Sequence, residues 1–206
     1  MNTLTDQLTR EVSRWFTRDR TTEPRAVIPI PSLSLPGGAA RVRRRHHGDV
    51  DAVARILRGI SSGGKYPLPR PASHRAWLTE GVVDAWVVER QGAILGHVAI
   101  GRAGTGAASS LRWREVTGRP LDDLALVSRF FVRLPERGQG IGTALLAAAV
   151  SGARARGLGP VADAEGTSRF GSPLYADHGW RLAAHDTFGG RRDHRLLSLY
   201  TLPSAH

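Results

Sequence analysis

Cysteine is missing from this sequence of 206 residues, and its absence excludes several kinds of chemistry. Without thiols the chain has no disulfide, no zinc site built on cysteine and no enzyme-bound thioester. Long apolar runs are missing as well: none approaches the roughly 18 residues that a membrane span requires, so no membrane association is expected. Asp6, Arg10 and Glu11 stand where a signal peptide would need an apolar stretch, which favours a cytoplasmic protein.

Lysine is nearly absent too, because Lys65 is the single lysine among 29 basic residues. This bias is typical of a GC-rich coding sequence, in which the A-rich lysine codons are rare. The formal net charge is +11, and the excess is spread along the chain, with the first quarter more basic than the rest. A nucleic-acid-binding protein would concentrate such charge on one face, so nucleic acid is not the expected partner.

Residues 1–39 are expected to form an extension ahead of the main domain. Apolar residues at spacings of three and four predict a short amphipathic helix over 3–19. Four prolines between residues 20 and 40, followed by a pair of glycines, predict an extended linker. A single globular domain is then expected over 40–203, and the hydrophobic content of 41% is enough to form its core.

From residue 40 onward, strand and helix patterns alternate. Strands are expected over 40–45, 85–89, 93–102, 124–132, 161–164 and 194–202. Helices are expected from residue 49, over 73–80, within 103–121, over 140–156 and from 172 to 179. This order predicts a mixed fold of the α/β or α+β class.

The strand over 124–132 runs into a glycine-rich loop that opens directly into a helix. Gly138, Gly140 and Gly142 allow positive φ angles and let a ligand approach the backbone closely. The first N–H groups of a helix have no partner inside it, and the helix dipole favours a negative charge beside them. The segment therefore predicts a site for a phosphate-bearing ligand.

Three kinds of phosphate loop compete for this interpretation. Residues 59–66 resemble a P-loop, but Tyr66 replaces the metal-binding hydroxyl and proline follows where a helix should begin. A dinucleotide fingerprint would need glycine where Thr143 stands. The pattern [RQ]-x-x-G-x-[GA] is satisfied by Arg137, Gly140 and Gly142.

With this motif the chain resembles the GNAT superfamily of acyl-CoA-dependent N-acetyltransferases. Two further blocks match the family in order: the hairpin strand at 92–98, and an L-Y-x-x-x-G-[FW] segment at 174–180. The resemblance covers residues 40–202. It implies a GNAT fold, with a central mixed, mostly antiparallel sheet that contains a splayed strand pair and is flanked by helices.

The resemblance also implies acetyl-CoA as the acyl donor. Backbone groups matching Phe130, Phe131 and Val132 would bind its pantetheine arm, and one of their N–H groups would polarise the thioester carbonyl. The pyrophosphate would be held by the loop and the start of the helix, namely Arg137, Gly138, Gln139, Gly140, Ile141, Gly142 and Thr143. The family often has an asparagine on the pantetheine arm, and since Asn2 is the only one here, Thr167 or Ser168 would take that contact. No metal is expected, because the histidines show no metal-ligand spacing.

Tyr175 matches the family's tyrosine that protonates the departing CoA thiolate, a role for a general acid. The residues do not single out a base for the amine. His97 and Asp123 are the retained candidates, although an isolated strand histidine is more often structural. Asp122, Asp163 and Glu165 stay open as further acidic candidates.

The expected reaction is therefore transfer of an acetyl group from acetyl-CoA directly to a primary amine of a small molecule or protein N-terminus. Direct transfer in a ternary complex follows from the lack of a cysteine nucleophile. The acceptor site is expected from the 59–72 loop and the segment near Trp113. The alternative is a catalytically silent GNAT-like acyl-CoA sensor or RNA-binding regulatory module, and a monomer or homodimer is expected.

Overall fold

The computed structural model describes residues 32–61, 73–104, 110–165, 171–188 and 195–203. They contain one eight-stranded sheet with the strand order β1-β2-β3-β4-β5-β6-β8-β7. Neighbouring strands are antiparallel except β5 and β6, which are parallel, so the mixed, mostly antiparallel sheet predicted from the sequence is confirmed.

The bounds of the elements agree with the predicted ones to within a few residues, with two exceptions. The strands are β1 (Ser32–Leu35), β2 (Gly38–Arg44), β3 (Val82–Arg90), β4 (Ala93–Arg102), β5 (Leu124–Val132), β6 (Gly159–Glu165), β7 (Arg181–Phe188) and β8 (Arg195–Thr201). The helices are α2 (Val50–Ser61), α3 (His74–Thr79), α4 (Ser110–Thr117), α5 (Ile141–Arg154) and α6 (Gly171–Asp177), with 3-10 turns η1 (His47–Asp49), η2 (Leu121–Asp123) and η3 (Leu134–Glu136).

The two exceptions are edge strands. β1 lies inside the stretch expected to be a linker, and it pairs with β2 across a turn in which Gly37 and Gly38 have φ angles of +88° and +116°. β7 follows α6 and was not predicted at all, since most of its residues are exposed and lack a clean apolar alternation. The helix expected over 3–19 lies outside the described residues.

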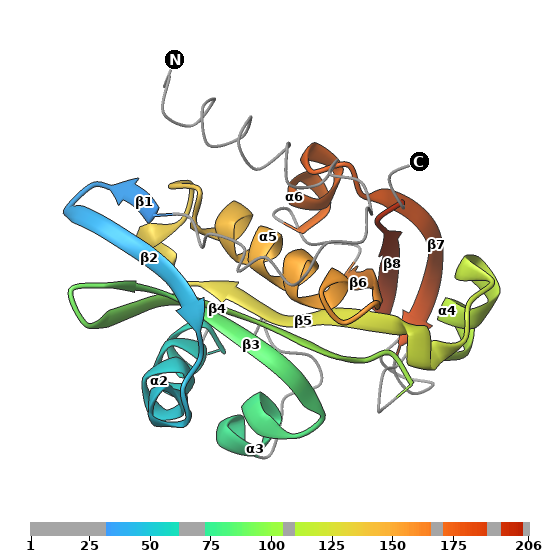
Figure 1. Ribbon diagram of the computed structural model, residues 1–206, viewed down its shortest axis with the longest axis horizontal. Helices are drawn as coiled ribbons and strands as arrows, with labels where there is room; N and C mark the ends of the chain where they lie inside the picture. Colours follow the sequence, from blue (N-terminus) through green and yellow to red (C-terminus); the bar gives the residue numbers. More distant parts are fainter. Residues whose placement is uncertain (1–31, 62–72, 105–109, 166–170, 189–194, 204–206) are drawn as a thin grey trace.

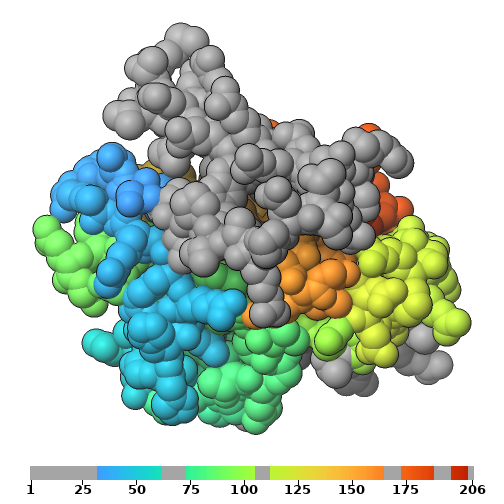
Figure 2. All heavy atoms as spheres, viewed as in Figure 1, coloured from blue at the N-terminus to red at the C-terminus, as the bar shows by residue number. Residues whose placement is uncertain are grey.

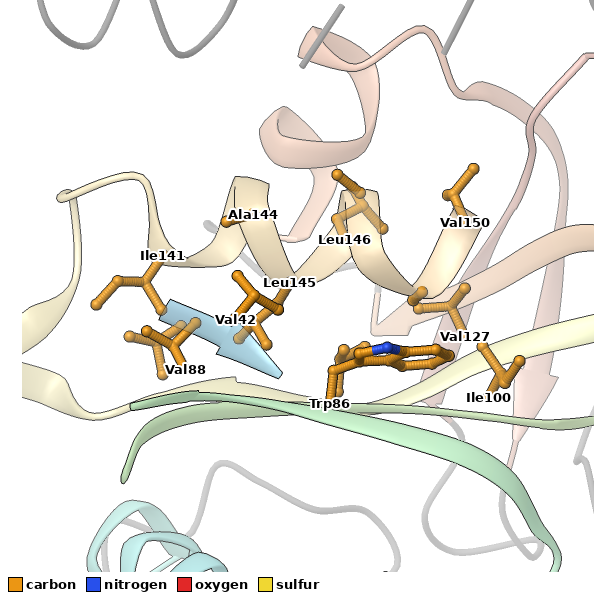
Figure 3. Packing of buried hydrophobic residues seen from close by; sticks show 14 of the residues in the cluster. Val42, Trp86, Val88, Ile100, Val127, Ile141, Ala144, Leu145, Leu146 and Val150 are labelled. Atoms are coloured by element: carbon orange, nitrogen blue, oxygen red, sulfur yellow. The ribbon is translucent and has the colours of Figure 1, made fainter. Parts of the chain in front are cut away.

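Helices cover both faces of the sheet, with α5 and α6 on one face and α2 and α3 on the other (Figure 1). On the α5 face, the strands and α5 enclose the largest apolar cluster, where Trp86 lies beneath the helix (Figure 3). A Cβ at Gly152 would stand 2.2 Å from the Trp86 ring, so only glycine lets α5 approach the sheet this closely. This cluster is called the α5 cluster below.

Two smaller apolar clusters lie on the opposite face. The α2–α3 cluster joins those helices to β3, β4 and β5 through residues such as Leu57, Val87 and Phe131. The α4 cluster packs Trp113 against Leu124, Val161 and Leu199. Figure 2 shows α2 and α3 at one side of the molecule and α4 at the other. The two clusters therefore cover different parts of this face of the sheet.

Candidate active site

The parallel strands β5 and β6 separate halfway along their length. Their ladder joins Leu124–Val127 to Gly159–Ala162 and ends there. Both strands continue, β5 to Val132 and β6 to Glu165, without further pairing to each other. This is the splayed pair expected from the sequence, and it places Phe130, Phe131 and Val132 on the unpaired part of β5.

A β-bulge lies in the part of β5 that no longer pairs with β6 but still pairs with β4. His97 pairs with Phe131 and Ala99 pairs with Ser128, so two residues of β5 oppose a single residue of β4. Arg129 in this bulge has a φ of +52°, a left-handed conformation that is rare outside glycine. The bulge turns Phe130 toward the α5 cluster and Phe131 into the α2–α3 cluster.

Side chains from three other elements hold this bulge in place. The Arg129 guanidinium donates to the carbonyls of Trp77 and Glu80 at the end of α3, and it lies 5.2 Å from the centre of the Trp77 ring. The Arg129 carbonyl accepts a 2.8 Å hydrogen bond from Nδ1 of His97. Because several independent contacts fix it, the strained backbone can persist at the splay.

His97 is fully buried, and both of its ring nitrogens are used. Nδ1 must carry the hydrogen, since its partner is a carbonyl, and Nε2 therefore accepts from Nη1 of Arg45 at 3.1 Å. Burial is the largest cause that lowers the His97 pKa, to about 3. This neutral, fully bonded ring favours a structural role in holding the bulge over the role of base.

Asp123 lies in η2 at the start of β5 and is exposed. Phe130 stands seven positions further along the chain, which is about 23 Å in an extended strand. Asp122 is its exposed neighbour, and its carbonyl accepts from Arg102. The structure therefore does not bring these two carboxylates to the splayed part of β5.

Asp163 is the acidic candidate that lies at the splay. The β5–β6 ladder pairs each residue with the one 35 positions later, so Ser128 and Asp163 are the first two residues that would pair but do not. Asp163 is partly buried, and burial raises the pKa of its carboxyl to about 6. The side chain of Glu165 lies outside the described residues.

The glycine-rich loop connects the splayed end of β5 to α5. Gly138 and Gly140 have φ angles of +75° and +82°, and Gly140 is the N-cap of α5. The carboxylate of Glu136 in η3 is largely buried and forms a 2.9 Å ion pair with Arg90 at the end of β3. This ion pair joins the loop, through Glu136, to the sheet, through Arg90. It therefore helps to hold the N–H groups at the start of α5 in place.

The remaining loop residues surround the same helix start. Gln139 donates to the carbonyl of Pro135 at 3.3 Å, and Arg137 is exposed, with its Nε donating to the carbonyl of Val132 at 3.3 Å. A Cβ at Gly142 would lie 3.7 Å from both Phe130 and Leu174, so β5, α5 and α6 meet at this point. Ile141 is buried in the α5 cluster and Thr143 is partly buried in the first turn of α5.

Tyr175 lies on α6, on the α5 side of the sheet. It is 4% exposed, its ring stacks on Tyr200 at 4.9 Å between centres, and Trp180 contacts it at 5.2 Å. These contacts fix the ring in the α5 cluster. Ser168, Thr167 and most of the 59–72 loop lie outside the described residues, so their expected roles stay predictions.

The fold that carries this geometry is similar to those of solved N-acetyltransferase structures. One is the ribosomal-protein-S18-alanine N-acetyltransferase of Escherichia coli, at 14% identity and a TM-score of 0.57, covering 81% of this chain and 95% of that chain. YncA from Salmonella typhimurium, solved with acetyl-CoA, has 19% identity and a TM-score of 0.60, covering 80% and 94%. An N-acetyltransferase from Staphylococcus aureus has 23% identity and a TM-score of 0.58, covering 80% and 99%.

The sequence itself matches a family model described as an acetyltransferase (GNAT) domain, over residues 83–182. Residues 83–182 therefore carry a GNAT acetyltransferase domain, as the motifs predicted, which makes this part of the chain an acyltransferase domain. No curated protein matches the chain at a significant level. Within the described part of the chain, no helix is both long and apolar enough to span a membrane, and no three potential metal ligands cluster there.

Proposed function

We propose that this protein transfers an acetyl group from acetyl-CoA directly to a primary amine of a small molecule or of a protein N-terminus. The observation that carries the proposal is the end of the β5–β6 ladder at Val127 and Ala162, directly before the glycine loop. Beyond Val127 the backbone of β5 is no longer paired with β6, so an extended ligand can pair with it there. The loop that follows offers the N–H groups suited to a phosphate.

The residues around the splay fit acetyl-CoA as the acyl donor. The backbone of Phe130, Phe131 and Val132 would bind the pantetheine arm, and an N–H there would polarise the thioester carbonyl, where negative charge develops. Among the described residues, nothing lies within 4 Å of a Cβ placed on Gly138, so none of them blocks a ligand from this backbone. The pyrophosphate would be held by Arg137, Gly138, Gln139, Gly140, Ile141, Gly142 and Thr143, with Ser168 as a further contact outside the described residues.

Tyr175 is proposed as the general acid. Its position beside the α5 cluster is on the same side of the sheet as the glycine loop, and the stack on Tyr200 fixes its ring. The amine nitrogen forms a bond to the acetyl carbon, the carbon–sulfur bond breaks, and the thiolate takes the phenolic proton. Since the chain has no cysteine, the acetyl group passes to the amine without a thioester on the enzyme.

The acceptor is proposed as a primary amine of either class. One structural neighbour is named for the alanine of ribosomal protein S18, and another, NAA60 of Arabidopsis thaliana, was solved with a bisubstrate analogue. The proposed compartment is the cytoplasm, and the proposed state is a monomer or homodimer without nucleic acid.

A thiol-release assay tests this function with acetyl-CoA and a panel of primary amines, including small metabolites, aminoglycosides and peptides with free N-termini. Release of CoA that depends on one amine, together with the acetylated product, is the expected result. Binding of acetyl-CoA without turnover of any amine would indicate a sensor. Salt-dependent RNA binding that is lost when residues 1–39 are deleted would indicate a regulatory module.

A further inference from the structure

Asp163 is the first residue of β6 that loses its partner on β5, as described above. On its other side it keeps a partner, because it pairs with Leu199 of β8. Its backbone is therefore anchored in the sheet while its neighbour across the splay, Ser128, is not hydrogen-bonded to it. This arrangement holds the Asp163 side chain at the edge of the gap in which the reacting groups would meet.

The side chain of Asp163 lies on the face opposite α5. Residues of β6 alternate between the two faces: Ala162 and Ala164 pack in the α5 cluster, whereas Val161 packs in the α4 cluster. Leu199, which pairs with Asp163, also belongs to the α4 cluster. The carboxyl thus lies on the face of the sheet that carries the α4 cluster and the α2–α3 cluster.

The chemistry of this carboxyl differs from that of an ordinary surface aspartate. Two causes act on its pKa: burial raises it, and a hydrogen bond from its own backbone N–H lowers it, with a net value of about 6. The elements packed around this face carry the following charged or titratable groups among the described residues: Arg45, Glu80, His97, Arg112, Arg114, Glu115, Arg129 and Asp186. Within the described part of the chain, none of these groups forms an ion pair with Asp163. A carboxylate without a paired cation is suited to receive an ammonium group.

We propose that Asp163 binds the acceptor's ammonium group and takes its proton, and that the acceptor reaches the splay on the face opposite α5. This inference rests on the proposed acetyl transfer. The ammonium gives one proton to the Asp163 carboxylate, which leaves a lone pair on nitrogen for attack on the acetyl carbon. The thiolate then takes the Tyr175 proton, the second proton lost from nitrogen returns to Tyr175 through water, and Asp163 releases its proton to solvent.

The test compares Asp163→Asn with a matched control, Asp186→Asn. Asp186 is also partly buried and lies on the same face, since its partner Leu197 packs in the α4 cluster, but it sits on the edge strand β7. With the best amine of the panel, kcat/KM of the wild type should rise with pH through an apparent pKa near 6. Asp163→Asn should lose that rise and lower kcat by about 10²–10⁴-fold, with the KM for acetyl-CoA unchanged.

The deficit of Asp163→Asn should shrink as the pH approaches the pKa of the amine, because the amine then arrives without its extra proton. A merely structural role would not give this recovery. Equal activity of the variant and the wild type at pH 7 would overturn the proposal, as would a loss that is constant at every pH. Asp186→Asn should keep the wild-type profile, and the same change in both variants would also overturn it.

A second measurement separates this inference from the proposed function. If the wild type acetylates no amine, the carboxyl of Asp163 is titrated by carbon-13 NMR with CoA bound, identified by comparison with Asp163→Asn. A signal that titrates near pH 6 and shifts with n-propylammonium chloride but not with sodium chloride supports an ammonium site. A signal that titrates near pH 4, or that responds equally to both salts, overturns it.

Discussion

The two faces of the sheet are assembled from the chain in different ways. On the α5 face, one contiguous segment, residues 124–154, supplies the strand, the glycine loop and the helix of the proposed donor site. On the opposite face, the groups around the splay come from distant parts of the chain: Arg45 meets His97, and Arg129 meets Trp77, each across 52 residues. The proposed donor half therefore depends on backbone geometry, whereas the proposed acceptor half depends on side chains that only the sheet brings together.

The largest effect should come from removing the proposed acid on the α5 face. Tyr175→Phe should lower kcat by about 10²–10⁴-fold and leave the KM for acetyl-CoA nearly unchanged, because the phenol acts on the leaving group and not on binding. Tyr200→Phe is the control, since this tyrosine is equally buried, at 4% exposed, and stacks on Tyr175. Steady-state kinetics decide the point: similar losses in both variants would mean that the hydroxyls only support packing.

The next effect tests whether the donor site depends on backbone. Gly138→Ala should weaken CoA binding by about tenfold or more, since the loop must keep a positive φ and a close approach of the ligand. Gly157→Ala is a matched control: its φ of +73° is close to the +75° of Gly138, and no described atom lies within 4 Å of an added Cβ at either position. Both variants should lose a similar ~1–2 kcal/mol in urea unfolding. Calorimetry that found equal CoA affinity in the two variants would contradict a backbone site at Gly138.

The contrast between the faces explains what could be predicted from the sequence. The strand, loop and helix of the donor site were predicted because Arg137, Gly140 and Gly142 stand at fixed spacing within one segment. The base could not be selected among His97, Asp123 and Asp163, because burial and partners decide it and no spacing reports them. The structure shows His97 bonded on both nitrogens and Asp163 at the end of a ladder, two facts that depend on pairing between distant strands.

The missed strands follow the same rule. In the sequence β1 stands between Pro31 and Pro36, and it pairs with β2 across a local turn, so its sequence pattern is that of a linker. β7 is mostly exposed, and its place at the sheet edge beyond β8 depends on a partner that follows it in the chain. Local apolar periodicity predicts buried strands, whereas an exposed edge strand is defined by its neighbour.

A smaller effect concerns how the stability of the fold depends on pH, through two groups on the face opposite α5. The pKa of His97 is about 3 in the folded protein and about 6.5 in an unfolded chain, so unfolding takes up a proton below pH 6.5. Its contribution to stability is therefore complete above pH 6.5 and is lost as the pH falls toward 3. Asp163 acts with the opposite sign: its raised pKa lowers stability as the pH rises from about 4 to about 6.

His97→Gln should remove the first of these slopes and cost about 1–3 kcal/mol at pH 7, because Arg129 and Arg45 each lose a buried partner. Urea unfolding between pH 4 and 8, in the wild-type and Asp163→Asn backgrounds, separates the two groups. The rise of kcat/KM near pH 6 should persist in His97→Gln. If this rise were lost in His97→Gln and kept in Asp163→Asn, His97 would be the base and Asp163 would not.

The smallest effect tests how much side-chain charge adds to the donor site. Arg137→Gln should weaken CoA binding only about three- to fivefold at low salt, because the residue is exposed and its charge is screened by solvent. The difference from the wild type should shrink further in 0.5 M salt, whereas the effect of Gly138→Ala should not. Arg102→Gln, an exposed arginine beside the Asp122 carbonyl at the end of β4, makes the same change in net charge and should leave binding unchanged. If Arg137→Gln instead weakened binding more than Gly138→Ala did, the donor site would depend on side-chain charge more than on backbone, and the contrast between the two faces would fail.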